Sequence, residues 1–149
     1  MTSAFLLAQL GAYAAGRFAE RIGELGLTPP LTGMLRAIAA TPGMSQQELA
    51  RHLGMPPSRL VAFLDDLEGR DLIERRQNPA DRRLSALHVT EHGTGILRRI
   101  GGVGRAHDED ISAPLDPAER EQLAALLGRL AEHHGLTAGV HPGYRTVRH

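Results

Sequence analysis

The segment that most constrains the fold is SQQELARHLGMPPSRLVAFLDDLEG, residues 45–69. Ser45, with Glu48 three residues later, forms the capping box that begins a helix. Gly54 suits the left-handed position that ends this helix, and Pro56 and Pro57 begin the next one. Two short helices joined by a tight glycine-containing turn predict a helix-turn-helix.

A β-hairpin is predicted directly after this motif, over residues 72–90, with its tip near residues 77–83. An apolar strand begins at Leu72, and Asn78-Pro79 has the chemistry of a turn. Residues 86–90 alternate in the way expected of a half-buried return strand. Two arginine pairs flank the turn, namely Arg75 with Arg76 and Arg82 with Arg83.

Apolar residues at helical spacing predict further helices on both sides of this central part. The fold class is therefore mainly α with a small β-wing, a winged helix-turn-helix between N- and C-terminal helices. The predicted division is an N-terminal helix over 1–27, a winged lobe over 28–90 (helix-turn-helix 45–70, wing 72–90), helices over 91–134, and a loose tail over 135–149.

Composition excludes several classes of protein. The 149 residues contain no cysteine, which rules out disulfides, thiolate metal sites and cysteine nucleophiles. No apolar run approaches the roughly 18 residues of a membrane span, so we expect a cytoplasmic protein. The chain has no P-loop, nucleophile elbow or dinucleotide fingerprint, and we predict that it is not an enzyme and needs no cofactor. The formal net charge is zero, and every basic residue is arginine.

Three stretches together resemble the MarR family of bacterial transcription regulators. NPADRRLSALHVTEHG is similar to the family wing, in which an Asp-x-Arg precedes a strand and Thr-x-x-Gly; here these are Asp81, Arg83, Thr90 and Gly93. LTPPLTGMLRAIAATPGMSQQELARHLGM resembles the second and third family helices. FLDDLEGRDLIERR resembles the end of the recognition helix and the first wing strand.

This resemblance implies a homodimer held by its first and last helices, which would then be dimerisation helices. It implies a recognition helix in the major groove of double-stranded DNA with a pseudo-palindromic operator, and a wing in the minor groove. It also implies a cleft for a small effector. We therefore expect a homodimeric repressor released by a small aromatic or lipophilic ligand.

Candidate DNA contacts lie on the recognition helix and at the start of the helix before it. Arg59 is the main candidate for a bidentate guanine contact, and Ser58 for a phosphate or base contact. The backbone N–H groups of Ser45, Gln46 and Gln47, at the start of the preceding helix, are candidates to bind a phosphate, although Ser45 is a helix cap in any case. The full set of expected DNA contacts is Ser45, Gln46, Pro57, Ser58, Arg59, Ala62, Arg75, Arg82 and Arg83.

The wing tip combines readers and braces. Guanidinium groups are attracted by the negative potential of a narrow minor groove, and we assign Arg82 as its reader. The resemblance implies that Arg83 pairs with an aspartate of the recognition helix, here Asp65. Asp81 would face phosphate, so we expect it to brace an arginine or the turn backbone.

A ligand cleft and a metal site are harder to place. Tyr13, Arg17, Met34 and Phe63 are candidates for the cleft, with Arg17 either binding a ligand carboxylate or forming a surface or intersubunit ion pair. Met34 and Phe63 also suit plain core positions. We predict no metal site. The rival function is a winged-helix protein-interaction module with weak or lost DNA binding, favoured by the apolar Val61 and Ala62.

Overall fold

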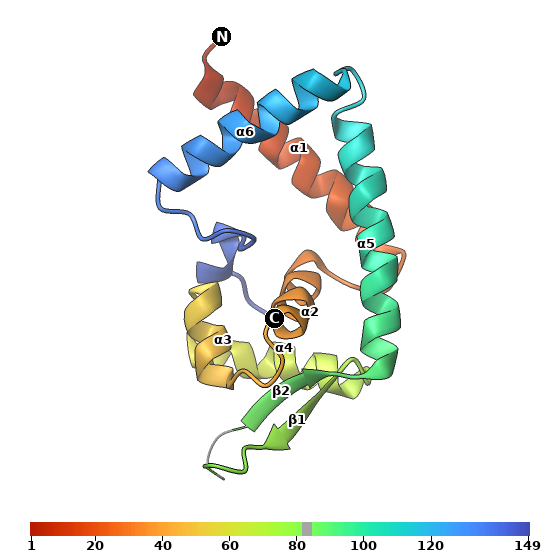
Figure 1. Ribbon diagram of the computed structural model, residues 1–149, viewed down its shortest axis with the longest axis vertical. Coiled ribbons are helices and arrows are strands. Elements are labelled where there is room, and N and C mark those ends of the chain that lie inside the picture. The colour runs from red at the N-terminus through yellow and green to blue at the C-terminus, as the bar shows by residue number, and fades with distance from the viewer. Residues whose placement is uncertain (82–84) are drawn as a thin grey trace.

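The computed structural model describes residues 1–81 and 85–149. The α1 and α6 helices lie at one end of the molecule, the winged lobe lies at the other, and α5 runs between the two ends (Figure 1). This arrangement confirms the predicted mainly helical class with a two-stranded wing. The elements in order are α1 (Ser3–Gly23), α2 (Pro29–Ala40), α3 (Gln46–Leu53), α4 (Pro57–Gly69), β1 (Ile73–Gln77), β2 (Ser85–Val89), α5 (Glu91–Ile111), α6 (Pro117–His133) and the 3₁₀ helix η1 (Pro142–Arg145).

The helix boundaries follow from local chemistry that the sequence displays. At the start of α3, the Ser45 hydroxyl accepts from Glu48 N at 3.1 Å, and the Glu48 carboxylate accepts from Ser45 N at 2.8 Å. Asp116 and Glu119 form the same reciprocal capping box at the start of α6. Gly54 ends α3 with φ +66°, a conformation that costs glycine little.

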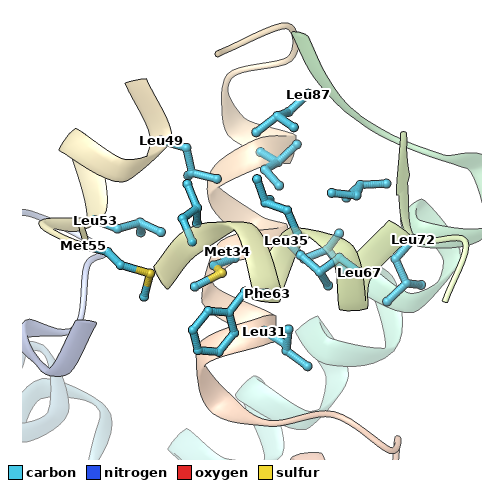
Figure 2. Packing of buried hydrophobic residues seen from close by; sticks show 14 of the residues in the cluster. Leu31, Met34, Leu35, Leu49, Leu53, Met55, Phe63, Leu67, Leu72 and Leu87 are labelled. Carbon is cyan, nitrogen blue, oxygen red and sulfur yellow. The ribbon is translucent and has the colours of Figure 1, made fainter. Parts of the chain in front are cut away.

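The core of the winged lobe forms where α2 and α4 pack together, with α3 and the wing closing its edges (Figure 2). Met34 and Leu35 on α2 and Leu64 and Leu67 on α4 are fully buried. The remaining core side chains include Leu31, Leu49, Leu53, Met55, Phe63, Leu72, Ile73 and Leu87. Burial of this kind stabilises a fold by about 1.5–3 kcal/mol for each large apolar side chain, so this shared core holds α2, α3, α4 and the wing together.

Besides the pairing within its own hairpin, the wing forms backbone hydrogen bonds to the segment that leads into α3. β1 and β2 pair antiparallel, with Ile73 opposite Val89 and Gln77 opposite Ser85. The segment before α3 adds to this sheet, because Gly43 N donates to Leu87 O at 2.8 Å and Leu87 N donates to Met44 O at 2.9 Å. The wing and the start of α3 therefore form one unit.

The tail after α6 is not loose, and this expectation was wrong. Gly135 ends α6 with a positive φ of +65°, and the chain then turns back to lie against α3 and α2 (Figure 1). Tyr144 in η1 is 5% exposed and belongs to the main hydrophobic core. The aperiodic tail sequence hid this packing, because it depends on one aromatic residue and a distant surface rather than on a helical pattern.

The two outermost helices expose apolar side chains. Along α1, Phe5, Leu6, Leu7, Leu10 and Tyr13 are 40–57% exposed. Along α6, Leu123, Leu126, Leu127 and Leu130 are 39–47% exposed, and the helix has no buried residue. These apolar surfaces are unusual for helices of a lone globular protein. Among residues 1–81 and 85–149, none of the helices is both long and apolar enough to cross a membrane.

Candidate nucleic-acid interface and adjoining cavity

The α4 helix presents a narrow exposed face beside the wing. Pro57, Ser58, Val61 and Ala62 are exposed, whereas Leu60, Phe63, Leu64 and Leu67 face the core. Asp65, exposed further along the helix, is charged and pairs with Arg75, whereas these four exposed side chains are small and uncharged. They leave the helix backbone accessible, which suits insertion into a major groove about 12 Å wide.

Arg59 does not share this outer face. It is partly buried at its edge, and its guanidinium donates to the backbone carbonyl of Arg145 in the tail at 2.8 Å. In this structure Arg59, the residue predicted to bind guanine, is therefore hydrogen-bonded within its own chain. Its contact with DNA stays a prediction.

The start of α3 lies next to the wing. The predicted Ser45 cap is confirmed by its reciprocal bonds with Glu48, which occupy both the Ser45 hydroxyl and its N–H group. Gln46 follows at the first helical position, and its side-chain oxygen is 3.5 Å from the Arg75 guanidinium. The phosphate contacts predicted for Ser45 and Gln46 stay predictions.

Arg75 ties the wing to the recognition helix. Its guanidinium donates to the Glu68 carboxylate at 2.5 and 2.9 Å and to the Asp65 carboxylate at 2.5 Å. This hydrogen-bonded cation lowers the pKa of Glu68 below its usual range, and the two carboxylates raise the pKa of Arg75. A sequence signal for this brace was present: Asp65 and Glu68 lie three positions apart on one helix face, and Arg75 follows in the next strand.

The wing tip itself is described only in part. Arg82 and Arg83 lie outside the described residues, so their predicted roles are untested. Asp81, just before them, is half-buried. The predicted partner of Asp65 was Arg83, and the partner that the structure describes is Arg75. At the turn, Ala80 N donates to the Asn78 side chain at 2.9 Å, as expected of an asparagine turn.

The base of the wing explains why threonine and glycine occur in Thr-x-x-Gly. The Thr90 hydroxyl donates to Asp71 O at 2.5 Å and accepts from Gly93 N at 2.9 Å, so one side chain caps α5 and fixes the wing. A Cβ on Gly93 would lie less than 3.0 Å from the Leu72 carbonyl oxygen. Only glycine allows α5 to begin this close to the strand.

A cavity of about 510 Å³ lies between α1, α2 and the tail. Phe18 contributes from α1, Gly33 and Arg36 from α2, and Tyr144 and Val147 from the tail. This volume is within the range of small-molecule sites, and most of the lining is apolar. Glycine in the middle of a helix, as at Gly33, is the sequence signal for such a close approach.

The four residues predicted for the cleft do not line this cavity. Tyr13 is 57% exposed on α1, and Arg17 forms a surface ion pair with Glu20 at 2.7 Å. Met34 and Phe63 lie in the core. Surface ion pairing and core packing were the alternative readings of Arg17 and of the two apolar residues. Within the described part of the chain, no three His, Asp or Glu side chains gather as a metal site.

The described geometry defines a class of protein. A helix-turn-helix with an accessible second helix, braced against a two-stranded wing and carried between long terminal helices, is the architecture of a winged helix-turn-helix transcription regulator. A sequence model of the MarR family matches residues 25–84. The chain belongs to this family, whose members regulate transcription and are not enzymes, as the sequence predicted.

Individual relatives agree with this assignment. A candidate regulatory protein for the hcr operon of Thauera aromatica is 44% identical over 70% of this chain, which spans 63% of that protein's length. The transcriptional repressor CouR, solved bound to a 23-mer DNA duplex, is 30% identical with a TM-score of 0.78, covering 87% of this chain and 92% of CouR. A MarR family protein of Mycobacterium tuberculosis, solved with salicylic acid, is 28% identical with a TM-score of 0.71, covering 87% and 96%.

Proposed function

We propose that this protein is a homodimeric, cytoplasmic repressor that binds pseudo-palindromic DNA and is released by a small aromatic or lipophilic ligand. The observation that carries the proposal is the exposed face of α4, bordered by a wing that Arg75 holds to the same helix. This geometry fixes the angle between a major-groove element and a minor-groove element on one rigid lobe.

DNA contacts are proposed for both parts of the lobe. Pro57, Ser58 and Ala62 on α4 would approach base edges, with Arg59 joining them when it leaves the tail. Ser45 and Gln46 at the start of α3 would lie near a phosphate. Arg82 and Arg83 at the wing tip would enter the minor groove. Arg75 acts in this proposal through its ion pairs, by holding the wing in position.

The terminal helices support the dimer. The exposed leucines of α6 and the apolar stripe of α1 together need a cover that their own chain does not provide. A two-fold partner covers both surfaces at once, and it places two recognition helices on the same side of the DNA. Their separation must match successive major grooves, about 34 Å apart, for tight binding.

Ligand release follows from this spacing. The cavity lies where α1 of the dimerisation region meets α2 of the winged lobe, so an occupant contacts both parts. A ligand that favours one angle between them shifts the population towards dimers whose recognition helices no longer match the grooves. The salicylic acid complex of the M. tuberculosis relative and the DNA complex of CouR support a shared scheme of DNA binding and aromatic ligand binding.

The first test is binding of purified protein to DNA from upstream of its own gene at two salt concentrations. We expect specific binding that weakens steeply with salt, because phosphate neutralisation releases counterions. Arg82→Ala removes a contact from each half of the dimer and should lower the log–log salt slope by about two. Arg98→Ala, which removes an exposed arginine from α5, is the matched control. Specific binding that Arg82→Ala leaves unchanged in both strength and slope would contradict the wing assignment.

The rival function is a protein-interaction module of the same fold. Val61 is 41% exposed on the face that would read DNA, and the chain has no net charge. An interaction module would show only weak DNA binding without sequence preference. Competition between the upstream fragment and a scrambled duplex therefore separates the two functions.

A further inference from the structure

The tail, defined here as residues 136–149, is seated on α2 by one side chain. The Tyr144 hydroxyl donates to the Pro30 carbonyl at 2.7 Å, and its ring packs over Gly33. A Cβ at Gly33 would lie less than 3.0 Å from the Tyr144 hydroxyl oxygen, so a larger residue would displace the tyrosine. Burial raises the pKa of Tyr144 to about 12. The tail is therefore a fitted part of the lobe.

The same tail forms a wall of the cavity. His141, Tyr144 and Val147 line it together with Phe18 and Arg36. The apolar lining suits an aromatic ring, and the Arg36 guanidinium suits a carboxylate. A ligand in this cavity would contact the tail as well as α1 and α2.

The last residues of the tail hold the recognition helix. The Arg145 carbonyl accepts from Arg59 at 2.8 Å. The His149 imidazole pairs with Asp66 at 2.8 Å, and its ring meets Phe63 edge-on, with centroids 5.0 Å apart. Cavity-lining residues and residues that contact the recognition helix therefore alternate within this one short segment, with Arg145 between Tyr144 and Val147.

We propose that the tail is an intramolecular strap that links the ligand cavity to Arg59, with a small aromatic carboxylic acid as the ligand. The ligand stabilises the seated strap, and the seated strap keeps Arg59 from DNA. This rests on the proposed function and adds a second route for release, in which a reading side chain is withdrawn while the spacing of the helices also changes.

Two full-length variants unseat the strap from opposite sides. Tyr144→Ala removes the side chain that occupies the seat, and Gly33→Ala fills the seat while favouring the α2 helix. Gly95→Ala, in α5, has nothing within 4 Å of its added Cβ and is the matched control for a glycine-to-alanine change. Thermal unfolding confirms that each variant is folded before binding is measured.

Two measurements test the strap with salicylate as the probe. Hydrogen exchange should show protected amides over residues 139–147 in the wild type, more protected with millimolar salicylate, and unprotected in both strap variants. Affinity for the upstream DNA without salicylate should rise about threefold to tenfold in both variants, the value of one hydrogen bond. Arg59→Ala should abolish this gain, because the strap acts through that arginine.

The outcomes separate the strap from the repressor. If the wild type binds DNA and responds to salicylate, and both strap variants behave as the wild type does, the strap is overturned and the proposed function stays intact. Tail amides unchanged by salicylate, or salicylate binding that tightens in Tyr144→Ala, would overturn the role of the tail as a ligand wall. Absence of specific DNA binding would overturn the proposed function, and the exchange experiment would still decide whether the tail and ligand share the cavity.

Discussion

A pair of glycines in α5 allows the wing base to be tested quantitatively. Gly93 and Gly95 are two residues apart in the same helix. A Cβ on Gly93 would collide with the Leu72 carbonyl oxygen and lie 2.7 Å from Val89 Cγ1, whereas a Cβ on Gly95 meets nothing within 4 Å. The two Gly→Ala substitutions share their chemistry and differ in the space available.

The two substitutions should change the free energy of unfolding in opposite directions. Alanine in place of glycine favours a helix by about 1 kcal/mol, which Gly95→Ala should gain in full. In Gly93→Ala, overpacking costs about 1–3 kcal/mol, and loss of the bond from Thr90 N to Leu72 O, 3.1 Å long, costs about 1 kcal/mol more. The net effect is a loss of about 1–3 kcal/mol, which lowers Tm by roughly 3–10 °C, against a rise of about 2–4 °C for Gly95→Ala.

Thermal unfolding followed by circular dichroism at one fixed protein concentration measures both shifts, because Tm of a dimer depends on concentration. Gly93→Ala should also weaken DNA binding, since α5 can no longer begin where Thr90 fixes the wing. Equal Tm shifts of the same sign in the two variants would refute the reasoning from close approach. The role of the glycine in Thr-x-x-Gly would then have to lie elsewhere.

Three further predictions concern charge and assembly. Arg75 lowers the pKa of Glu68, so their ion pair stabilises the fold above the unfolded pKa near 4.5, and this stabilisation is lost as the pH falls through the folded pKa. Glu68→Gln should therefore reduce the fall in unfolding free energy at acid pH, measured by urea titration. An unchanged fall would show that the ion pair does not stabilise the fold. In the Tyr13→Phe variant, Tyr144 is the remaining tyrosine, so absorbance at 295 nm should report its ionisation alone. We expect a midpoint near pH 12, with the tail undocking as the pH rises through that value. A midpoint near pH 10 would show that Tyr144 is not buried against α2. Leu126→Glu should weaken a two-fold dimer by roughly 100-fold or more in sedimentation, because each copy loses a leucine worth about 1.5–3 kcal/mol; an intact dimer would exclude α6 from the interface.

Local chemistry was sufficient to predict the helices and the hairpin. The capping box at Ser45, the prolines at helix starts and Gly54 at a helix end act within one turn of the chain, so their effects can be predicted from neighbouring residues. The same holds for the Asn78 turn. These features fixed the order of elements and hence the winged lobe.

Long-range packing was the part that local patterns left out. Tyr144 bonds to Pro30, 114 residues away in the sequence, and nothing near either residue indicates the other. The cleft residues depended in the same way on how α1 is rotated about its axis: Tyr13 and Arg17 are on its surface, whereas Phe18 lines the cavity. The partner of Asp65 was chosen by resemblance, whereas Arg75 lay closer along the chain.

No residue of the α6 helix is fully buried within its own chain, and this has a consequence for how gene dosage sets repression. Ordering the backbone of a helix of 17 residues costs about 1–2 kcal/mol per residue, and a lone protomer recovers little of that by packing. If the leucines of α6 are covered by a second copy, folding of the helix and pairing of chains become one event. At low protein concentration the helix would then stay frayed and the operator unoccupied. A modest rise in synthesis would raise the concentration of folded dimer steeply, so repression would depend sharply on how much of the protein the cell contains.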